Sequence, residues 1–385
     1  MLRFLDAGES HGKGMSTIVE GLPYGIPVSA DAIELELARR RLGYGRSGRM
    51  KLEQDRVDIL SGVRSGTTLG SPVAMLVINA EYEKWREIMP VEGESAGEPI
   101  TGLRPGHADL AGALKYGTRD LREVLERASA RETVGRVCAG ALAKSLLSEL
   151  GISVHSHVLA VGKVKAGGGS ETPSPQDLKE VDSDPMRCLY AEASELMRHE
   201  VDRAREDGDS LGGVVEVIAF GLPAGLGSYV HWDRRLDARL AGAIMAIQAI
   251  KGVEIGAGFG LAGMRGSQAV DVIHHAPGRG FYHGSNHAGG LEGGVTNGEP
   301  LVIRAAMKPI PTLASPRDSV DLESRAAVKA AVERADICAV PAAAVIAESG
   351  AAYVLADALL EKTGGDSIEE IRVRFEAILR HQAEF

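Results

Sequence analysis

The alternation of apolar and polar residues along the chain predicts several β-strands. Four stretches are rich in β-branched and other apolar residues and are bounded by Gly or Pro, as antiparallel strands often are. They are MSTIVEGL (15–22), VAMLVIN (73–79), GVVEVIAFGL (213–222) and PLVIRAAM (300–307). Hairpin-forming strands in antiparallel sheets are therefore expected.

Helical patterns follow the first and third of these stretches. SADAIELELARRRLG (29–43) offers Ser29 as an N-cap and Gly43 just past its end, and a second helical pattern lies within 231–252. Both helices are expected to start shortly after a Gly-Leu-Pro turn.

Three further helical patterns are rich in small residues and cover 130–151, 325–336 and 341–362. The first carries small residues four positions apart, at Gly135, Ala139 and Ala143. Small side chains let helix backbones approach closely, so we expect a tightly packed helical layer covered by sheets, in an α+β fold.

The chain contains two copies of one pattern. GESHGKGMSTIVEGLPYG (8–25) returns without a gap as GDSLGGVVEVIAFGLPAG (208–225), and GVRSGTTLGSPV (62–73) is echoed by GLEGGVTNGEPL (290–301). Such a long period is unlike a solenoid repeat and predicts a duplicated half-domain. We expect a single domain, residues 1–385, with pseudo-repeats of about 1–200 and 201–385.

One position breaks this internal symmetry, because His11 in the first copy corresponds to Leu211 in the second. Turns explain the shared glycines, so the unshared histidine needs a local reason. Flanking glycines permit close approach of a ligand, and an imidazole transfers protons near neutral pH. The alternative is an incidental surface histidine, which is the usual case for an isolated one.

Two segments lack a regular pattern. Residues 79–106 lead directly into Arg104 and His107, so this segment is expected to be a lid. Residues 164–186 contain Gly and Pro but no convergent chemistry, and a surface excursion is expected there.

Composition and charge exclude several classes of protein. A net charge of -10 and an aromatic content of 4% argue against nucleic-acid binding. Cys138, Cys188 and Cys338 are far apart and no metal-ligand spacing occurs, so neither a disulfide framework nor a metal site is expected. No secretory signal or membrane span is evident, so a cytoplasmic protein without a membrane partner is expected.

Arginines are nevertheless clustered between residues 39 and 49 and between 104 and 136. Such clusters suit a small polyanionic ligand, although many arginines of this kind lie on solvated helix faces. His107 follows Arg104 and directly precedes a helical pattern, where the pair could hold an anionic leaving group and give it a proton. The alternative is that His107 merely begins the helix.

Two other stretches could bind a phosphate. ERASARET (126–133) offers a capping box among arginines, and a helix N-terminus is an anion site, although a solvated capped helix fits equally well. Residues 285–313 join a Gly-rich loop to Lys308, which together could hold a phosphate or a ring edge. GFGLAG (258–263) matches a dinucleotide motif, but neither the helix nor the acidic residue of that motif follows.

Seven motifs, in order, resemble those of the chorismate synthase family. They are GESHG (8–12), RRRLGYGRSGRM (39–50), RPGHADL (104–110), ERASARET (126–133), GFG with GS (258–267), GGVTNGEPLVIRAAMKPIPT (293–312) and CAVPAAAVIAE (338–348). Each is modest alone, but together they span nearly the whole chain. The resemblance implies a β-α-β sandwich with internal pseudo-symmetry, assembled as a homotetramer.

The reaction implied by this resemblance is the anti-1,4 elimination of phosphate from 5-enolpyruvylshikimate 3-phosphate to give chorismate, the last step of the shikimate pathway to aromatic amino acids. Reduced FMN is required although there is no net redox change. The chain has no appended flavin-reductase domain, so an external flavin reductase activity is expected, with NADPH as an indirect reductant.

The resemblance also implies residue roles. His11 protonates or stabilises the reduced flavin, His107 is the acid toward the departing phosphate, and Asp336 assists proton removal at flavin N5. The implied substrate ligands are Arg40, Arg46, Arg49, Arg104, Ser129, Arg131 and Arg334. The implied FMN contacts are Arg127, Ala128, Ser129, Gln248, Ala249, Gly293, Gly294, Lys308, Pro309, Ile310, Pro311, Thr312 and Arg334.

Three points qualify this assignment. Arg40 and Arg46 match positions that the family also assigns to NADP. The family commonly has Arg-His-Asp where this chain has Arg-Ala335-Asp. Two other functions stay open at this point: flavin or nucleotide binding without lyase chemistry, suggested by the Gly-rich loops, and nucleic-acid binding, suggested only by the arginine clusters.

Overall fold

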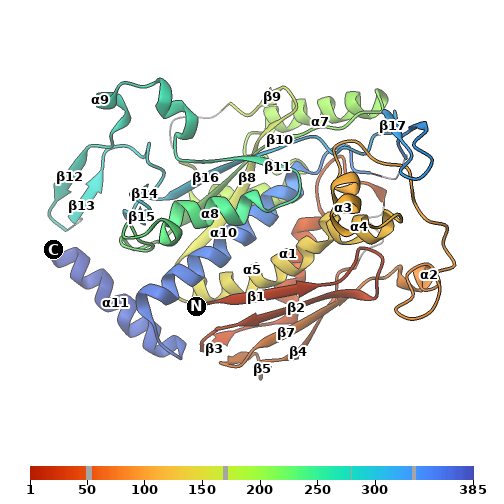
Figure 1. Ribbon diagram of the computed structural model, residues 1–385. Helices are drawn as coiled ribbons and strands as arrows, with labels where there is room; N and C mark the ends of the chain where they lie inside the picture. Colours follow the sequence, from red (N-terminus) through yellow and green to blue (C-terminus); the bar gives the residue numbers. More distant parts are fainter. Residues whose placement is uncertain (49–53, 168–171, 279, 332–334) are drawn as a thin grey trace.

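In the computed structural model, two antiparallel sheets enclose a layer of helices (Figure 1). The structure describes residues 1–48, 54–167, 172–278, 280–331 and 335–385. The first sheet has the order β1(Arg3–Ala7), β2(Gly14–Glu20), β7(Val73–Ile78), β4(Val57–Ser61). The second has the order β11(Ile250–Ile255), β16(Leu301–Met307), β10(Gly213–Phe220), β8(Ser153–Val161), β9(Val164–Lys165). All four strands expected from the sequence are present, and the α+β prediction is confirmed.

Short strands pair outside these sheets. A small sheet has the order β3(Tyr24–Pro27), β6(Thr67–Leu69), β5(Val63–Arg64), and three ribbons are β12(Ile273–Ala276) with β13(Gly280–His283), β14(Leu291–Glu292) with β15(Val295–Thr296), and β17(Asp318–Val320) with β18(Ala327–Lys329).

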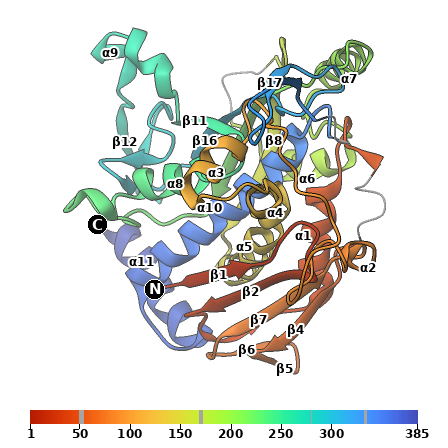
Figure 2. The same ribbon diagram turned by 45° about the vertical axis from the view of Figure 1, so that its right-hand side comes forward.

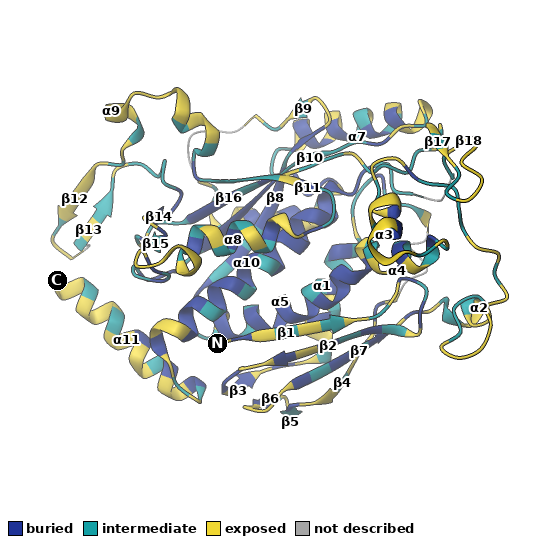
Figure 3. Cartoon of the chain, viewed as in Figure 1, coloured by how far each residue is buried: buried dark blue, intermediate teal, exposed yellow. Residues whose placement is uncertain are grey.

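The helical layer consists of α1(Ala30–Arg41), α5(Thr133–Ser148), α8(Leu236–Met245) and α10(Val340–Thr363), whose inner faces are buried (Figure 3). The predicted start of α1 is confirmed, because the Ser29 side chain accepts a hydrogen bond from the backbone N–H of Ala32. The remaining α-helices of the described residues are α2(Tyr82–Trp85), α3(Asp109–Tyr116), α4(Arg122–Ala128), α6(Pro175–Glu180), α7(Ala191–Glu206), α9(Gly266–Ala269) and α11(Ile368–Glu384). The 3-10 turns are η2(Ala130–Glu132), η3(Val181–Ser183), η4(Trp232–Arg234) and η5(Gly258–Gly263).

The two sheets share one strand plan. The order β1-β2-β7-β4 corresponds to β8-β10-β16-β11, and in each set the third strand along the chain forms the edge beside the fourth. In both copies a buried threonine anchors the Gly-Leu-Pro turn. Its hydroxyl accepts a backbone N–H (2.9 Å for Thr68, 2.8 Å for Thr296) and donates to the proline carbonyl (2.5 and 2.7 Å). This geometry supports a duplication. The second copy of this strand order begins with β8. The boundary between the two pseudo-repeats near residue 200 stays a prediction.

The two copies differ at the position that is His11 in the first copy and Leu211 in the second. Leu211 forms a parallel bridge with Cys338, its backbone N–H donates to the carbonyl of Ile337 (2.8 Å), and its side chain packs against the core. His11 instead lies beside α4. The second copy therefore uses this position for packing.

Two sequence predictions are wrong. The described part of 325–336 is no helix, because residues 327–329 form β18 and Arg325 adopts a left-handed conformation (φ 60°) in the hairpin turn. The described part of 164–186 is no mere surface excursion either, since α6 packs on β8 and buries Leu178, and Val181 of η3 is buried as well. A capping box at Ser174 starts α6, and its apolar side covers the sheet.

Among the described residues, α10 is long and apolar enough to cross a membrane, but 83% of its apolar window is buried inside the protein. It contacts α5, α8, α1 and both β8 and β10. Its apolar character is therefore explained by its place in the middle layer.

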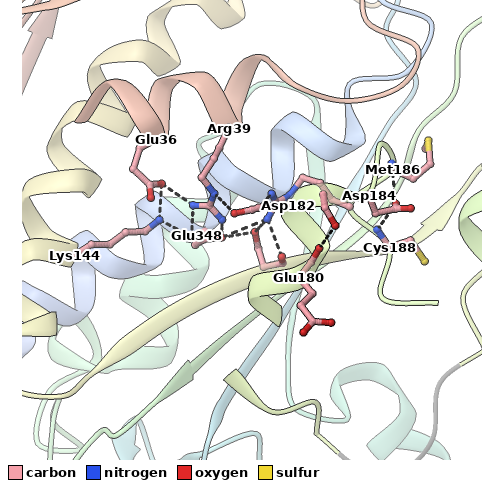
Figure 4. Close-up of polar contacts among 12 residues, drawn as sticks. Glu36, Arg39, Lys144, Glu180, Asp182, Asp184, Met186, Cys188 and Glu348 are labelled. Carbon is pink, nitrogen blue, oxygen red and sulfur yellow. Dashed lines mark hydrogen bonds and ion pairs between the residues drawn. The ribbon is translucent and has the colours of Figure 1, made fainter. Parts of the chain in front are cut away.

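A buried ion-pair network joins three of these helices (Figure 4). Glu348 of α10 is fully buried, accepts a hydrogen bond from Arg39 of α1 (2.8 Å) and pairs with Lys144 of α5. Arg39 and Lys144 both also bind Glu36, and Arg39 binds Asp182 (2.8 Å). Burial raises the pKa of Glu348, but the charges of Lys144 and Arg39 outweigh burial and hold this pKa below its usual range. The network thereby fixes α1 against its neighbours.

A separate arm extends from this body. The described residues from η5 to the β12–β13 ribbon (258–278 and 280–283) project away from the layers in two views (Figures 1 and 2). Several large apolar side chains of the arm are exposed: Phe259, Val270, Val272, Ile273 and Phe281.

The close contact between α5 and α10 gives a stability prediction. A Cβ on Gly140 would lie 2.7 Å from the Cα of Ser349 and closer still to its Cβ, whereas a Cβ on Gly350 of α10 meets no atom within 4 Å. We expect Gly140→Ala to lower the free energy of unfolding by about 1–3 kcal/mol through overpacking. Gly350→Ala should raise it by up to about 1 kcal/mol because alanine favours helix. Urea unfolding measures both, and equal effects would contradict this account of the crossing.

Candidate active site

One cavity of about 450 Å³ gathers most of the predicted site residues. Its walls come from α1 and the loop after it, the turn before α3, the end of α4, residues 247–249, the segment after β16 and the start of α10. The predicted residues that line it are His11, Arg40, Arg46, Arg104, His107, Ala128, Ser129, Arg131, Gln248, Ala249, Lys308, Ile310, Pro311, Thr312 and Asp336.

His11 is held on two sides. Its Nδ1 lies 2.8 Å from Oε1 of Glu126, and its backbone N–H donates to Oε2 of the same carboxylate (2.7 Å). Glu126 is only 3% exposed. The ring of Trp85 stacks on the imidazole, with centroids 4.0 Å apart. The loop between β1 and β2, helix α4 and helix α2 therefore meet at His11.

His107 has a similar carboxylate partner. Its Nδ1 lies 2.5 Å from Oδ1 of Asp109, which also accepts hydrogen bonds from Arg104 (Nε to Oδ2 2.8 Å, Nη2 to Oδ1 2.9 Å). Burial raises the pKa of Asp109, but the hydrogen bonds from Arg104 and His107 outweigh burial and hold this pKa well below its usual range. Asp109 thus stays ionised and fixes the side chains of Arg104 and His107 at the cavity wall.

Arginines from distant segments converge on a second carboxylate. Arg131 donates to Oδ1 of Asp55 (2.6 Å) and to Asn79 (3.0 Å), while Arg40 and Arg41 place nitrogens 3.9 and 3.8 Å from Oδ2 of Asp55. The Asp55 carboxylate is 4% exposed. Arg40 and Arg131, which line the cavity, therefore meet at one buried carboxylate, and their guanidinium groups suit an anionic ligand.

Asp336 pairs with a fourth arginine of the cavity. Its Oδ2 lies 3.0 Å from Nη1 of Arg46, and its Oδ1 accepts the backbone N–H of Ser47 (2.6 Å). Ala335, directly before Asp336 in the expected motif, also lines the cavity.

Polar groups also line the side of the cavity formed by Ser129, residues 247–249 and Lys308. The hydroxyls of Ser129 and Ser10 lie 3.3 Å apart, and Lys308 donates to the carbonyl of Gly106 (2.7 Å) in the turn before His107. Gln248 donates to Glu132 (3.2 Å), while its buried Oε1 has no partner among the described residues. Ala249 adopts a left-handed conformation (φ 67°), which is uncommon for a residue with a Cβ and typical of functional segments.

Four predicted residues in the described part of the chain do not line this cavity. Arg127 points to the end of β1, where it binds Asp6 (3.0 Å) and the carbonyl of Gly8. Gly293 and Gly294 form the β14–β15 turn, and neither they nor Pro309 line the cavity formed by the described residues. Arg49 and Arg334 lie outside the described residues.

Sequence reasoning missed the carboxylates behind the cationic residues. Glu126, Asp109 and Asp55 were left without a role, and so was Trp85. Asp109 carried a local signal, since it stands two residues after His107 within one motif. Glu126 and Asp55 carried none, because their partners His11 and Arg131 lie 115 and 76 residues away.

Comparisons with known proteins agree with this geometry. A family model described as chorismate synthase matches residues 2–360. The chorismate synthase of Moorella thermoacetica is 55% identical over 385 residues, covering 100% of both chains. The chain belongs to the chorismate synthase family. The chorismate synthase of Aquifex aeolicus is 51% identical, covering 100% of this chain and 99% of the relative. A crystal structure of chorismate synthase aligns with a TM-score of 0.82 and 43% identity, covering 100% of this chain and 99% of that one.

These matches confirm the family that the motifs indicated. The protein is an enzyme of the chorismate synthase type, a lyase of the shikimate pathway. The open alternative of a binding protein without catalysis is thereby set aside.

Asp109 yields a pH-dependent prediction. Asp109→Asn should lower the free energy of unfolding at pH 7 by about 1–3 kcal/mol, because Arg104 then faces a neutral partner in a buried site. The pKa of Asp109 is depressed on folding. Its stabilisation is therefore complete above the unfolded value of about 4 and is lost as the pH falls through the folded value.

Urea unfolding between pH 7 and pH 3 measures this dependence. The difference between wild type and Asp109→Asn should shrink below pH 4, while Asp58→Asn, at an exposed position of β4, should change little at any pH. A difference that stays constant down to pH 3 would contradict the assigned ion pair.

Proposed function

We propose that the cavity binds 5-enolpyruvylshikimate 3-phosphate together with reduced FMN and eliminates phosphate to give chorismate. The observation that carries this proposal is the convergence of four arginines and two carboxylate-held imidazoles on one cavity of a chain from this family. The substrate combines a phosphate with two carboxylates, and guanidinium groups bind such oxyanions with bidentate geometry.

The cavity residues fit a flavin. Leu125, Ile247 and Met307 supply apolar wall, the unpartnered Oε1 of Gln248 can accept a ring N–H, and nearby cations suit the phosphate of FMN. When bound, reduced FMN supplies the transient electron donation that eases cleavage of the carbon–oxygen bond.

The chain's own residues then bind, orient and move protons. Arg40, Arg46, Arg104 and Arg131 orient the substrate through its anionic groups. His107, fixed by Asp109, gives a proton to the departing phosphate oxygen. His11 holds a proton beside the flavin, and Asp336 is the carboxylate that assists proton removal. Since Arg40 and Arg46 face the cavity with carboxylate partners, we assign them to the substrate rather than to NADP.

Reduced flavin comes, in this proposal, from an external flavin reductase activity with NADPH as the indirect reductant. We place the enzyme in the cytoplasm, without nucleic-acid or membrane partners. The burial of α10 within the protein supports the absence of a membrane partner.

An anaerobic assay tests the proposed reaction. Wild-type enzyme mixed with photoreduced FMN and 5-enolpyruvylshikimate 3-phosphate should release phosphate and form chorismate. His107→Ala should lower the rate by about 10²- to 10⁴-fold, because the positioned proton donor is lost. His199→Ala, at a solvent-exposed position of α7, should leave the rate unchanged. Absence of phosphate release by the wild type would overturn the proposal.

We further propose a homotetramer in which the arm contacts a second copy of the chain. Ile273 and Phe281 lie on one face of the β12–β13 ribbon, because residue 275 pairs with 281 and 273 pairs with 283. They are 62% and 59% exposed. Exposed apolar patches of this kind mark interaction surfaces.

Light scattering after size-exclusion chromatography checks the assembly. The wild type should have four times the chain mass of 40.6 kDa. Ile273→Glu combined with Phe281→Glu should lower the mass, because buried unpaired charges oppose association. Leu60→Glu, on β4 and 64% exposed, is the matched control and should not change it. A monomeric wild type would contradict the proposal.

A further inference from the structure

Glu126 directs both of its oxygens to one residue. Oε2 accepts the backbone N–H of His11 (2.7 Å), and Oε1 lies 2.8 Å from Nδ1 of the same residue. The backbone carbonyl of Glu126 also accepts the N–H of Ser10 (3.0 Å). The carboxylate is 3% exposed, so the ring and the carboxylate meet largely away from solvent.

Trp85 restricts the same ring from its face. The two rings stack at 4.0 Å with an interplanar angle of 29°, and the guanidinium of Arg122 lies 5.6 Å from the Trp85 centroid. Flipping the imidazole would therefore break the Nδ1 contact, and tilting it would break the stack. Glu81 and Arg131 are the other charged residues that share the small cavity beside His11.

An ionised carboxylate only accepts hydrogen bonds, so the nitrogen that faces it must carry the hydrogen. We propose that Glu126 is a positioning residue that fixes the Nδ1–H form of His11, which makes Nε2 the nitrogen through which His11 exchanges a proton in the reaction. This inference rests on the proposed function for its catalytic consequence. The tautomer itself can be measured without turnover.

Replacing Glu126 by glutamine separates this role from a purely structural one. The amide oxygen of the introduced side chain can still accept the backbone N–H of His11, so the local fold is kept. The amide nitrogen then faces Nδ1 and donates to it, which forces the hydrogen to Nε2. Glu126→Asp keeps the negative charge with a shorter side chain. Glu123→Gln is the matched control, since Glu123 is an exposed carboxylate of the same helix.

The tautomer is read by ¹⁵N magnetic resonance of histidine-labelled enzyme, with the His11→Asn variant identifying the signals of His11. In the wild type, Nδ1 should give a protonated, pyrrole-type signal. In Glu126→Gln, Nδ1 should become pyridine-type and Nε2 pyrrole-type, while Glu123→Gln should match the wild type. An unchanged His11 spectrum in Glu126→Gln would overturn the proposal.

The anaerobic lyase assay measures the consequence. Glu126→Gln should be slower by about 100-fold or more, because a wrong tautomer removes the positioned proton. Glu126→Asp should recover part of this loss. In a His11→Ala background, Glu126→Gln should cause almost no further loss, since residues that act as one unit are not additive.

Equal losses from Glu126→Gln in the presence and absence of His11 would overturn the proposal, as would a Glu126→Gln rate within about threefold of wild type. A wild type without lyase activity would instead refute the proposed function. In that case the ¹⁵N spectra would still decide whether Glu126 sets the tautomer.

Discussion

Repulsion among guanidinium charges is the constraint on which this site depends. Four guanidinium groups line one cavity, and two unit charges 4 Å apart repel by about 4 kcal/mol at an effective dielectric constant of 20. Asp55, Asp109 and Asp336 offset this repulsion, each bound to one or more of these arginines. The carboxylates, with Glu126 beside His11, also fix side-chain directions, so the arginines and imidazoles face the cavity before a ligand arrives.

The helical layer holds the arginines of the cavity in place. Arg39 and Arg40 are successive residues of α1, about 100° apart around the helix axis. Arg39 enters the buried network with Glu348, while Arg40 lines the cavity and binds Thr133 (3.0 Å). The same network that joins α1 to α5 and α10 therefore limits how far Arg40 can move. Close packing at Gly140 limits sliding of α5 against α10.

The fold could be predicted from local patterns where those patterns were strong. Ser29 marks the start of α1, and alternating apolar runs mark β2, β7, β10 and β16. The predicted helix at 325–336 was wrong because pairing with β17 decides the structure of residues 327–329, against the local preference of the small residues. Tertiary contacts also turned the expected surface segment around Leu178 into a cover for the second sheet.

The candidate site was partly predictable for a similar reason. Motifs indicated His11, His107 and the arginines, since His11 breaks the internal repeat beside glycines, His107 stands at the start of a helical pattern, where anions bind, and the arginines are clustered. The carboxylates that neutralise the arginines reach the site through long-range contacts, such as that between Asp55 and Arg131. The spacing of residues along the chain does not indicate such contacts. Gly293 and Gly294 could be placed in a turn from sequence, but their distance from the cavity depends on how β14 and β15 sit beside α8.

The replacement of His11 by Leu211 in the second copy has an evolutionary consequence. A symmetric pair of identical halves would have offered two equivalent reaction centres, each under the same chemical selection. In the second copy this position forms a backbone bridge with Cys338 instead. That half supplies Gln248, Lys308 and Asp336 to the cavity beside His11, so the two unequal halves build one reaction centre together.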